Sequence, residues 1–454
     1  MSKPSLARGT RDFGPEVMAK RTYILQTITQ VFKKFGFSQI ETPAVENLSV
    51  LMGKYGDEGD QLLFKILNSG DFANKLSPND LADGSKTMLP KIAEKGLRYD
   101  LTVPFARFVV MNRHDLPVPF KRYQVQPVWR ADRPQKGRYR EFYQCDADVV
   151  GTDSLLCEAE IIMMLKEAFG KLNLTQYSIK INNRKILKGI AEVIGTPGRE
   201  SDLCVAIDKL DKIGKEKVEV ELADRGFTAE NVGKLEPLFG LAGEPVQMLN
   251  TLRDWLSSSD TAIKGIDELT EVLDTVKEFG EDLSHVSIDP TLARGLSYYT
   301  GAIFEVKAEG VQIGSISGGG RYDDLTGSFG MSDMPGVGIS FGVDRIYDVL
   351  EELNLFPEEA VAGTQVLIVN FDNDSRKNCL PILKKLRDAE VSAEFYPTSA
   401  KLKKQFDYAN KKGISYVLMA GSDEINSGKY SLKNMLTGTQ DLYDINQIIE
   451  ILNK

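Results

Sequence analysis

The segment from 120 to 149 constrains the fold of this chain more than any other, because it joins two predicted strands through a basic loop. Seven Lys or Arg residues against two acids give residues 120–141 a local charge of +5. Gln144, Asp146 and Asp148 alternate along the returning strand, so their side chains should share one face of a sheet. Such a hairpin can bind a polyanionic phosphate beside a small cationic or polar group. The alternative is an exposed hairpin whose charges face solvent.

Size and composition indicate a globular protein with roughly three domains, because 454 residues are too many for one core. The first residues contain no secretory apolar segment, and no apolar run is long enough to span a membrane. We therefore expect a cytoplasmic protein with no membrane contact. Four scattered cysteines and only two histidines argue against a disulfide framework or a dedicated metal site.

Charge does not by itself suggest a nucleic-acid partner, since the net charge of the chain is −9. The local excess of positive charge in the hairpin nevertheless permits contact with RNA phosphates. An RNA partner is therefore compatible with the sequence but needs a stronger signal than charge.

The pattern of apolar residues changes along the chain and predicts its domains. A main domain should comprise residues 1–180 and 286–356, where strand signals alternate with helices. Residues 181–285 are charged, helical in periodicity and poor in strand signals, which predicts a helical insertion. Residues 362–454 have a β-α-β-α-β pattern that is typical of a small α/β domain with a largely parallel sheet.

Charged and polar side chains interrupt several apolar runs of the main domain. Asp100 lies two residues before Thr102, and Arg294 lies just before the paired Tyr298 and Tyr299. An unpaired buried charge costs several kcal/mol. The sequence therefore predicts that these groups converge on a cleft; the alternative is a set of internal salt bridges, for example between Arg294 and Asp100.

Two glycine-rich segments lie near the end of the main domain. The sequence SGGGRYDDL (317–325) is predicted to be a turn whose backbone passes close to a ligand. The sequence GVGISFGVDRIYDVLEEL (336–353) is predicted to be a strand that enters a helix near Gly342.

Together these segments resemble the histidyl-tRNA synthetases, a family of class II aminoacyl-tRNA synthetases. The segment FGFSQIETP is similar to the first class motif, the hairpin with Arg130 to the second, and GVGISFGVDRI with Arg345 to the third. ARGLSYYTGAIFE and SGGGRYDDL are similar to two signatures of the histidine-specific branch. The resemblance covers essentially the full chain. In one departure, the usual Arg-x-Glu of the second motif is Arg-Ala-Asp at 130–132.

The resemblance implies an α+β catalytic domain around a mostly antiparallel sheet, a helical insertion, and a C-terminal α/β domain that binds the anticodon. It implies ATP-dependent ligation of L-histidine to tRNA(His) through a histidyl-adenylate, with Mg²⁺ on the phosphates and a homodimeric enzyme. Attack of the histidine carboxylate on the α-phosphorus needs positioning and charge neutralisation more than a proton-transfer residue.

The resemblance also implies a role for each matching residue. The α-ammonium of histidine would be bound by Asp100, Thr102 and Gln144. Asp148 and Tyr299 would face the imidazole, with Tyr298 beside it. Tyr322 would line the amino-acid pocket. The α-phosphate and the substrate carboxylate would be bound by Arg130 and Arg294. The γ-phosphate would be bound by Arg345. The acceptor end of the tRNA would meet a loop that carries Gln135, Lys136, Arg138 and Arg140.

Two other functions are considered. A non-catalytic, histidine-sensing regulatory paralogue would tend to lack the RGLSYYTG segment and the terminal α/β domain, and this chain has both. A class II synthetase for another amino acid, such as threonine or proline, is disfavoured by the lack of Cys/His zinc ligands and by the two adjacent tyrosines, which suit an aromatic substrate ring.

Overall fold

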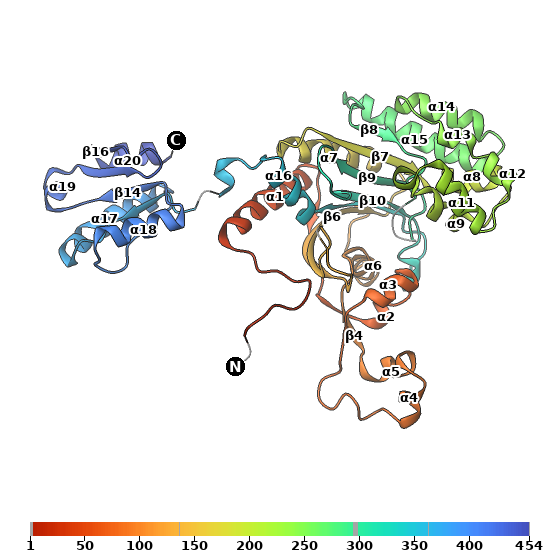
Figure 1. Cartoon of the computed structure of the whole chain (residues 1–454), viewed down its shortest axis with the longest axis horizontal. Helices are drawn as coiled ribbons and strands as arrows, with labels where there is room; N and C mark the ends of the chain where they lie inside the picture. The colour runs from red at the N-terminus through yellow and green to blue at the C-terminus, as the bar shows by residue number, and fades with distance from the viewer. Residues whose placement is uncertain (1–2, 136, 294–297, 362, 454) are drawn as a thin grey trace. The chain divides into compact units, whose positions relative to one another are not determined.

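The structure is a computed structural model that describes residues 3–135, 137–293, 298–361 and 363–453 (Figure 1). Two residues with predicted roles, Lys136 and Arg294, lie outside these ranges. The chain divides into two compact units, Met1–Phe356 and Pro357–Lys454, each with its own core. Within the described ranges, every helix is too short or too polar to cross a membrane.

The first unit is built on a large sheet that confirms the predicted, mostly antiparallel arrangement. Among the described residues its strands follow the order β1-β5-β6-β11-β10-β9-β7-β8, with parallel pairs only between β1 and β5 and between β7 and β8. The strands are β1 (Ser38–Gln39), β5 (Phe120–Trp129), β6 (Glu141–Val150), β7 (Tyr177–Asn183), β8 (Val286–Ile288), β9 (Ala302–Ala308), β10 (Ser317–Tyr322) and β11 (Gly336–Gly342).

The predicted hairpin is formed by β5 and β6, which pair one residue for one from Phe120 opposite Val150 to Trp129 opposite Glu141. Alternation separates the two faces of β6. The small apolar residues of this strand join the main core, whereas Asp146 and Asp148 lie on the other face, also buried. The hairpin therefore lies inside the molecule and is not an exposed ribbon.

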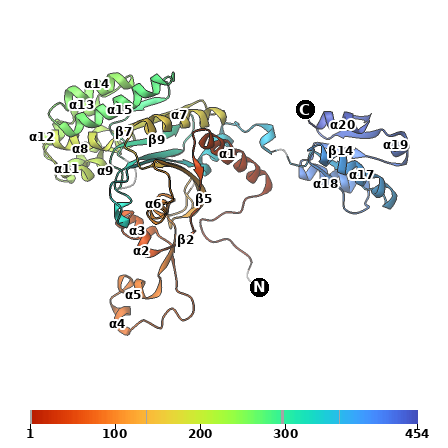
Figure 2. The ribbon, with the colours of Figure 1, turned by 180° about the vertical axis from the view of Figure 1, so that it is seen from behind.

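Three helices cover the apolar face of the sheet: α1 (Pro15–Lys34), α7 (Leu156–Lys171) and α16 (Val343–Glu352) (Figures 1 and 2). Pro15 begins α1, and Gly36, with φ +83°, follows its end, as helix-ending glycines commonly do. The ring of Phe32 packs against Tyr123 and Phe341, each at 5.6 Å between centroids. This packing anchors the class-motif segments to one core.

The segment 317–325 was predicted to be a turn, and that prediction is wrong, because most of it is strand β10 between β9 and β11. A Cβ added at Gly319 would overlap the carbonyl oxygen of Gly338 in β11. The glycines thus let two backbones approach closely within a sheet, which is a different use of the same residue type. By contrast, the predicted transition from strand to helix near Gly342 is confirmed.

The opposite face of the sheet meets α6 (Thr102–Met111), which contains Pro104 in its first turn, where proline is tolerated. A smaller sheet, in the order β2-β4-β3, and short helices extend from this side. These elements are β2 (Val45–Asn47), α2 (Leu48–Leu51), α3 (Gly56–Leu62), β3 (Lys65–Ile66), α4 (Pro78–Ala82), α5 (Ser85–Ile92) and β4 (Lys95–Leu97).

The segment 184–278 is helical, in agreement with the predicted character of this region. It contacts the sheet through α15 and α14, and its apolar residues join the same core as the sheet. Its treatment as a separate domain stays a prediction. The helices are α8 (Arg184–Val193), α9 (Glu200–Ile207), α10 (Leu210–Ile213), α11 (Lys215–Asp224), α12 (Ala229–Gly233), α13 (Glu236–Phe239), α14 (Pro245–Trp255) and α15 (Asp260–Glu278). A short 3-10 turn, η1 (Gly327–Phe329), follows β10.

The second unit has the α/β fold predicted for the end of the chain. Its strand order among the described residues is β13-β12-β14-β15-β16, parallel around β12 and antiparallel beyond β14. The elements are η2 (Glu358–Val361), β12 (Val366–Ile368), α17 (Asn373–Asp388), β13 (Ala393–Phe395), α18 (Leu402–Lys412), β14 (Tyr416–Met419), α19 (Ser422–Ser427), β15 (Tyr430–Asn434), β16 (Gln440–Tyr443) and α20 (Ile445–Leu452).

Candidate active site

A buried polar cluster lies on the face of β6 that points away from the main core, and Asp148 is at its centre. Arg122 lies opposite Asp148 in the hairpin register, with Nη2 2.7 Å from Asp148 Oδ2. The phenol of Tyr322, at the end of β10, donates a hydrogen bond of 2.7 Å to Asp148 Oδ1. All three side chains are almost completely buried. Asp148 is therefore a carboxylate with two fixed partners that come from two different strands.

Asp100 lies in the same region, between β4 and α6. Its Oδ1 accepts hydrogen bonds from the phenol of Tyr55 at 2.9 Å and from the backbone N–H of Val103 at 3.1 Å. Burial raises the pKa of Asp100, an effect opposed mainly by the Val103 N–H and by the charge of Arg130. Arg130 is thus close enough to Asp100 to stabilise its ionised form.

The three predicted tyrosines pack together beside these carboxylates. The ring of Tyr298 meets those of Tyr299 and Tyr322 edge to face, with centroids 5.1 and 6.0 Å apart. Tyr298 also makes a side-chain hydrogen bond to Thr102, the first residue of α6. Burial raises the pKa of each phenol, so all three remain neutral at physiological pH.

Several buried oxygens of the cluster accept no hydrogen bond from the residues that the structure describes. They are Asp100 Oδ2, Asp146 Oδ1, Gln144 Oε1 and Gln124 Oε1. The amide nitrogen of Gln144 donates a hydrogen bond of 3.3 Å to Ser340 Oγ, which holds the side chain, while its oxygen has no donor among the described residues. A buried acceptor without a donor costs about 1–3 kcal/mol. The guanidinium nitrogens of Arg122 in the same cluster also have no hydrogen-bond partner among the described residues. A ligand that presents several N–H donors would satisfy the oxygens.

Burial also changes the pKa of Asp146, the third buried carboxyl group of the cluster. Burial raises its pKa to about 7; the nearby charge of Arg122 opposes that rise and Asp148 adds to it. Near neutral pH this group is therefore divided between its acid and its carboxylate, and a bound cation would favour the carboxylate.

The two predicted phosphate-binding arginines that are described lie on different elements near the hairpin loop. Arg130 donates from Nε to the carbonyl of Tyr99 at 3.0 Å, and its guanidinium lies over the Tyr99 ring, 4.3 Å from the centroid. Arg345, on α16, donates to the carbonyls of Gly137 at 3.1 Å and Ser315 at 2.7 Å. Both guanidinium groups are therefore held in place by backbone carbonyls.

The loop between β5 and β6 carries the residues predicted to meet the tRNA. Gln135 and Arg138 exchange backbone hydrogen bonds of 3.1 and 2.9 Å, which closes a tight turn at the tip. Arg138 lies 3.5 Å from Asp132 and is about half exposed. Arg140 donates to the carbonyl of Asp132 at 3.0 Å. The loop thus presents basic side chains to solvent from a braced backbone.

The structure thus gathers Asp100, Thr102, Asp148 and the three tyrosines in one cluster, with Gln144 on the same strand face. Arg345 binds the carbonyls of Gly137 and Ser315. Arg294 and Lys136 lie outside them. Sequence reasoning missed Arg122, Gln124 and Tyr55. The hairpin register could have identified Arg122 and Gln124, since one-for-one pairing places them opposite Asp148 and Asp146.

Comparison with known proteins covers both units. A family model described as Histidyl-tRNA synthetase matches residues 81–346, and one described as Anticodon binding domain matches residues 365–454. The chain is 58% identical over its full length to the full-length Histidine--tRNA ligase of Cytophaga hutchinsonii. It is 58% identical to the enzyme of the same name from Phocaeicola vulgatus, with 99% of each chain covered. The crystal structure of histidyl-tRNA synthetase from Nostoc sp. PCC 7120 superimposes with a TM-score of 0.85 at 32% identity, covering 100% of this chain and 99% of that one.

Proposed function

The chain belongs to the histidyl-tRNA synthetase family, and from this premise we propose how its residues carry out the reaction. The enzyme ligates histidine to tRNA with ATP as substrate. Full-length identity to ligases and the match of the terminal unit favour this activity over that of a regulatory paralogue. In domain terms, we assign residues 1–180 and 286–356 to catalysis, 181–285 to a helical insertion and 362–454 to anticodon binding.

Histidine binds in the buried polar cluster. Its α-ammonium donates to the free oxygens of Asp100 and Gln144, beside Thr102. Its imidazole N–H reaches Asp148, whose orientation is set by Arg122 and Tyr322, while the rings of Tyr298 and Tyr299 pack against the substrate ring. The observation that carries this assignment is the set of buried acceptors that the described part of the chain leaves without donors. A triply donating ammonium is the kind of ligand that such a set fits.

ATP binds toward the hairpin loop. Arg130, fixed by the Tyr99 carbonyl and ring, neutralises the α-phosphate as the histidine carboxylate attacks it. Arg345 holds the γ-phosphate end, and Arg294 shares the α-phosphate and the substrate carboxylate. Pyrophosphate leaves. A terminal ribose hydroxyl of tRNA(His) then attacks the histidyl carbonyl of the adenylate, which forms the ester bond to tRNA and releases AMP.

Mg²⁺ would lower the charge repulsion among the phosphates. No group of three or more His, Cys, Asp or Glu side chains that could hold a metal ion occurs among the described residues. We therefore assign its ligands chiefly to phosphate oxygens and water, which suits an ion that dehydrates reluctantly.

The tRNA acceptor end meets the loop with Gln135, Lys136, Arg138 and Arg140, and the anticodon meets the second unit. Basic side chains that face solvent suit a phosphate backbone. A homodimeric state, which rests on the family alone, and a cytoplasmic location complete the proposal.

The proposed histidine site is tested with Asp100→Asn. This change replaces an acceptor that faces the ammonium with a donor or a neutral oxygen, so we expect KM for histidine to rise by about tenfold or more, whereas KM for ATP stays within about twofold. ATP–pyrophosphate exchange at varied histidine and ATP measures both values, with the exposed Asp153→Asn as control. An unchanged KM for histidine would remove Asp100 from the site.

A further inference from the structure

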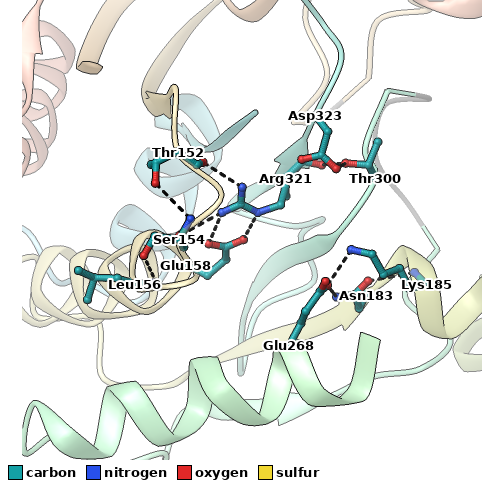
Figure 3. A network of polar contacts seen from close by, with 10 residues as sticks. All are labelled: Thr152, Ser154, Leu156, Glu158, Asn183, Lys185, Glu268, Thr300, Arg321 and Asp323. Carbon is teal, nitrogen blue, oxygen red and sulfur yellow. Dashed lines mark hydrogen bonds and ion pairs between the residues drawn. The ribbon is translucent and has the colours of Figure 1, made fainter. Parts of the chain in front are cut away.

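Behind the proposed histidine site lies a polar network that the reaction itself does not use (Figure 3). It centres on Arg321, which directly precedes Tyr322 in β10. Successive side chains of a strand point to opposite faces, so Tyr322 reaches Asp148 while Arg321 reaches toward the start of α7. Whatever fixes Arg321 therefore also fixes the strand position from which Tyr322 projects.

Arg321 is held by a two-point ion pair that is buried. Its Nε and Nη2 lie 2.5 and 2.7 Å from the two oxygens of Glu158, and its terminal nitrogens also donate to the carbonyls of Thr152 and Ser154. The exposed fraction is 4% for Arg321 and 0% for Glu158. A planar fork that is matched to a carboxylate at both points allows little rotation, so the pair defines the geometry of this part of the strand.

A second pair connects β10 to the segment that carries the other two tyrosines. The backbone N–H of Thr300 donates to the carbonyl of Arg321 at 2.9 Å, and its hydroxyl donates to Asp323 Oδ2 at 2.6 Å (Figure 3). Thr300 directly follows Tyr299. The next carbonyl, that of Gly301, accepts from the backbone N–H of Arg184 at the start of α8. Hydrogen bonds thus connect the segment that carries Tyr298 and Tyr299 to β10 and to α8.

These observations share one arrangement. There are two side-chain pairs, Arg321–Glu158 and Thr300–Asp323. Each pair includes a residue that is directly next in sequence to a tyrosine that lines the proposed site. We propose that both pairs are positioning pairs: they set the separation between Tyr322, with its bond to Asp148, and the Tyr298–Tyr299 rings, and so set how well the imidazole of histidine fits. The inference rests on the proposed function of that cluster.

The expected consequence is specific to one substrate. Loss of either side-chain pair should shift the tyrosines relative to Asp148 and weaken histidine binding. The arginines proposed to bind phosphate are held by other contacts, to the carbonyls of Tyr99, Gly137 and Ser315. Histidine KM should therefore rise while ATP KM and kcat remain nearly constant. A change that merely loosened the fold would alter both substrates together.

The main test uses Thr300→Val, which keeps the shape of the side chain and removes the hydroxyl, with Thr300→Ser as the matched control that restores it. In ATP–pyrophosphate exchange we expect KM for histidine to rise about tenfold in the valine variant, the scale of one hydrogen bond to a charged group. ATP KM and kcat should stay within about twofold, and the serine variant should behave as the parent does. Calorimetric titration with histidine alone should show the same loss of affinity.

A double-mutant cycle separates the pair from its surroundings. Thr300→Val, Asp323→Ala and the double variant should all raise histidine KM to the same degree, because each removes the same bond. Arg321→Lys, which keeps the charge but loses the fork, should raise histidine KM as well if circular dichroism shows that it folds. If it does not fold, the Thr300 and Asp323 variants alone decide the question.

Three results would overturn the inference: an unchanged histidine KM in Thr300→Val, a parallel rise of ATP KM, or additive effects in the cycle. Asp100→Asn is measured alongside to keep this inference separate from the proposed site. If Asp100→Asn raises histidine KM and Thr300→Val does not, only the positioning role fails. If neither variant changes it, the site assignment itself is wrong.

Discussion

At the scale of single residues, the site is governed by what burial does to carboxyl groups. Asp100, Asp146 and Asp148 are each almost completely buried, and burial raises the pKa of all three. Arg122 forms an ion pair with Asp148, and the charge of Arg130 acts on Asp100. Burying carboxylates with incomplete compensation is costly unless a ligand supplies the missing donors. The cluster is therefore suited to bind a small cation such as an amino-acid ammonium.

Asp146 gives a prediction for the effect of pH on stability. Its pKa is about 7 in the folded protein against 3.8 for an ordinary aspartate, so the folded state retains a proton that the unfolded state releases. The free energy of unfolding should therefore fall as pH rises from about 4 to 7, because the buried group must ionise. Asp146→Asn removes this cost. We expect the melting temperature of Asp146→Asn minus that of the parent to increase as pH rises over that range, measured in calorimetric scans.

The control for this experiment is Asp153→Asn, whose side chain is exposed. Its melting temperature relative to the parent should not depend on pH in the same range. Saturating histidine should reduce the difference in melting temperature between Asp146→Asn and the parent at pH 8, because the bound ammonium stabilises the ionised carboxylate of the parent. A difference that stays constant with pH would show that Asp146 does not titrate as described.

At the scale of elements, the glycine-rich strand β10 brings the two halves of the catalytic region together. It lies between β9 and β11, and its last residue, Tyr322, contacts Asp148 on β6 across β11. Gly338 of β11 is opposite Asp148, and a Cβ at Gly338 would overlap that carboxylate. The glycines thus provide the space in which a side chain from one strand can reach past its neighbour.

Gly319 and Gly318 make a matched pair for testing this role. A Cβ at Gly319 would overlap the backbone of Gly338, whereas one at Gly318 would lie 3.4 Å from the Phe304 carbonyl oxygen, an ordinary contact. We expect Gly319→Ala to lower the free energy of unfolding of the first unit by about 1–3 kcal/mol or more, the scale of an overpacked core. Gly318→Ala should cost less than about 1 kcal/mol. Urea denaturation measures both, and equal losses would contradict the argument.

At the scale of the whole molecule, the chain consists of two units, and the proposed active site lies in only one of them. The first unit contains the proposed active site and the main core, while the second has a sheet and core of its own. Because each unit buries its apolar residues internally, each has the physical basis to fold by itself. The site cluster, from Asp100 to Tyr322, lies entirely in the first unit.

Removing residues 362–454 should therefore affect the two half-reactions differently. We expect the rate of ATP–pyrophosphate exchange to remain within about tenfold of that of the full chain, since none of the proposed contacts to histidine or ATP is lost. Charging of tRNA(His), measured with limiting tRNA, should fall by at least about a hundredfold, the scale on which a linked second contact strengthens binding. An equal loss of both activities would count against separate roles for the two units.

Local patterns determined the parts of this protein that depend on neighbours in sequence. Alternation along 141–150 placed its acids on one face, helical periodicity predicted the helical character of 181–285, and the spacing of strands and helices predicted the terminal α/β fold. These predictions were confirmed because periodicity acts over a few residues, and burial of one face then follows. The role of SGGGRYDDL was misjudged because local sequence cannot distinguish a turn from a strand that needs glycine to approach another backbone.

Only the tertiary structure decided which distant groups meet. The contacts of Asp148 with Tyr322, of Asp100 with Tyr55, and of Arg321 with Glu158 join residues up to 174 positions apart. Such pairings depend on strand order and on which face of the sheet each helix covers, and neither is encoded in the spacing of residues along one segment. The residue types of a ligand site can thus be predicted from sequence, whereas the acceptors left without donors, on which the proposed function rests, emerge only when the chain is folded.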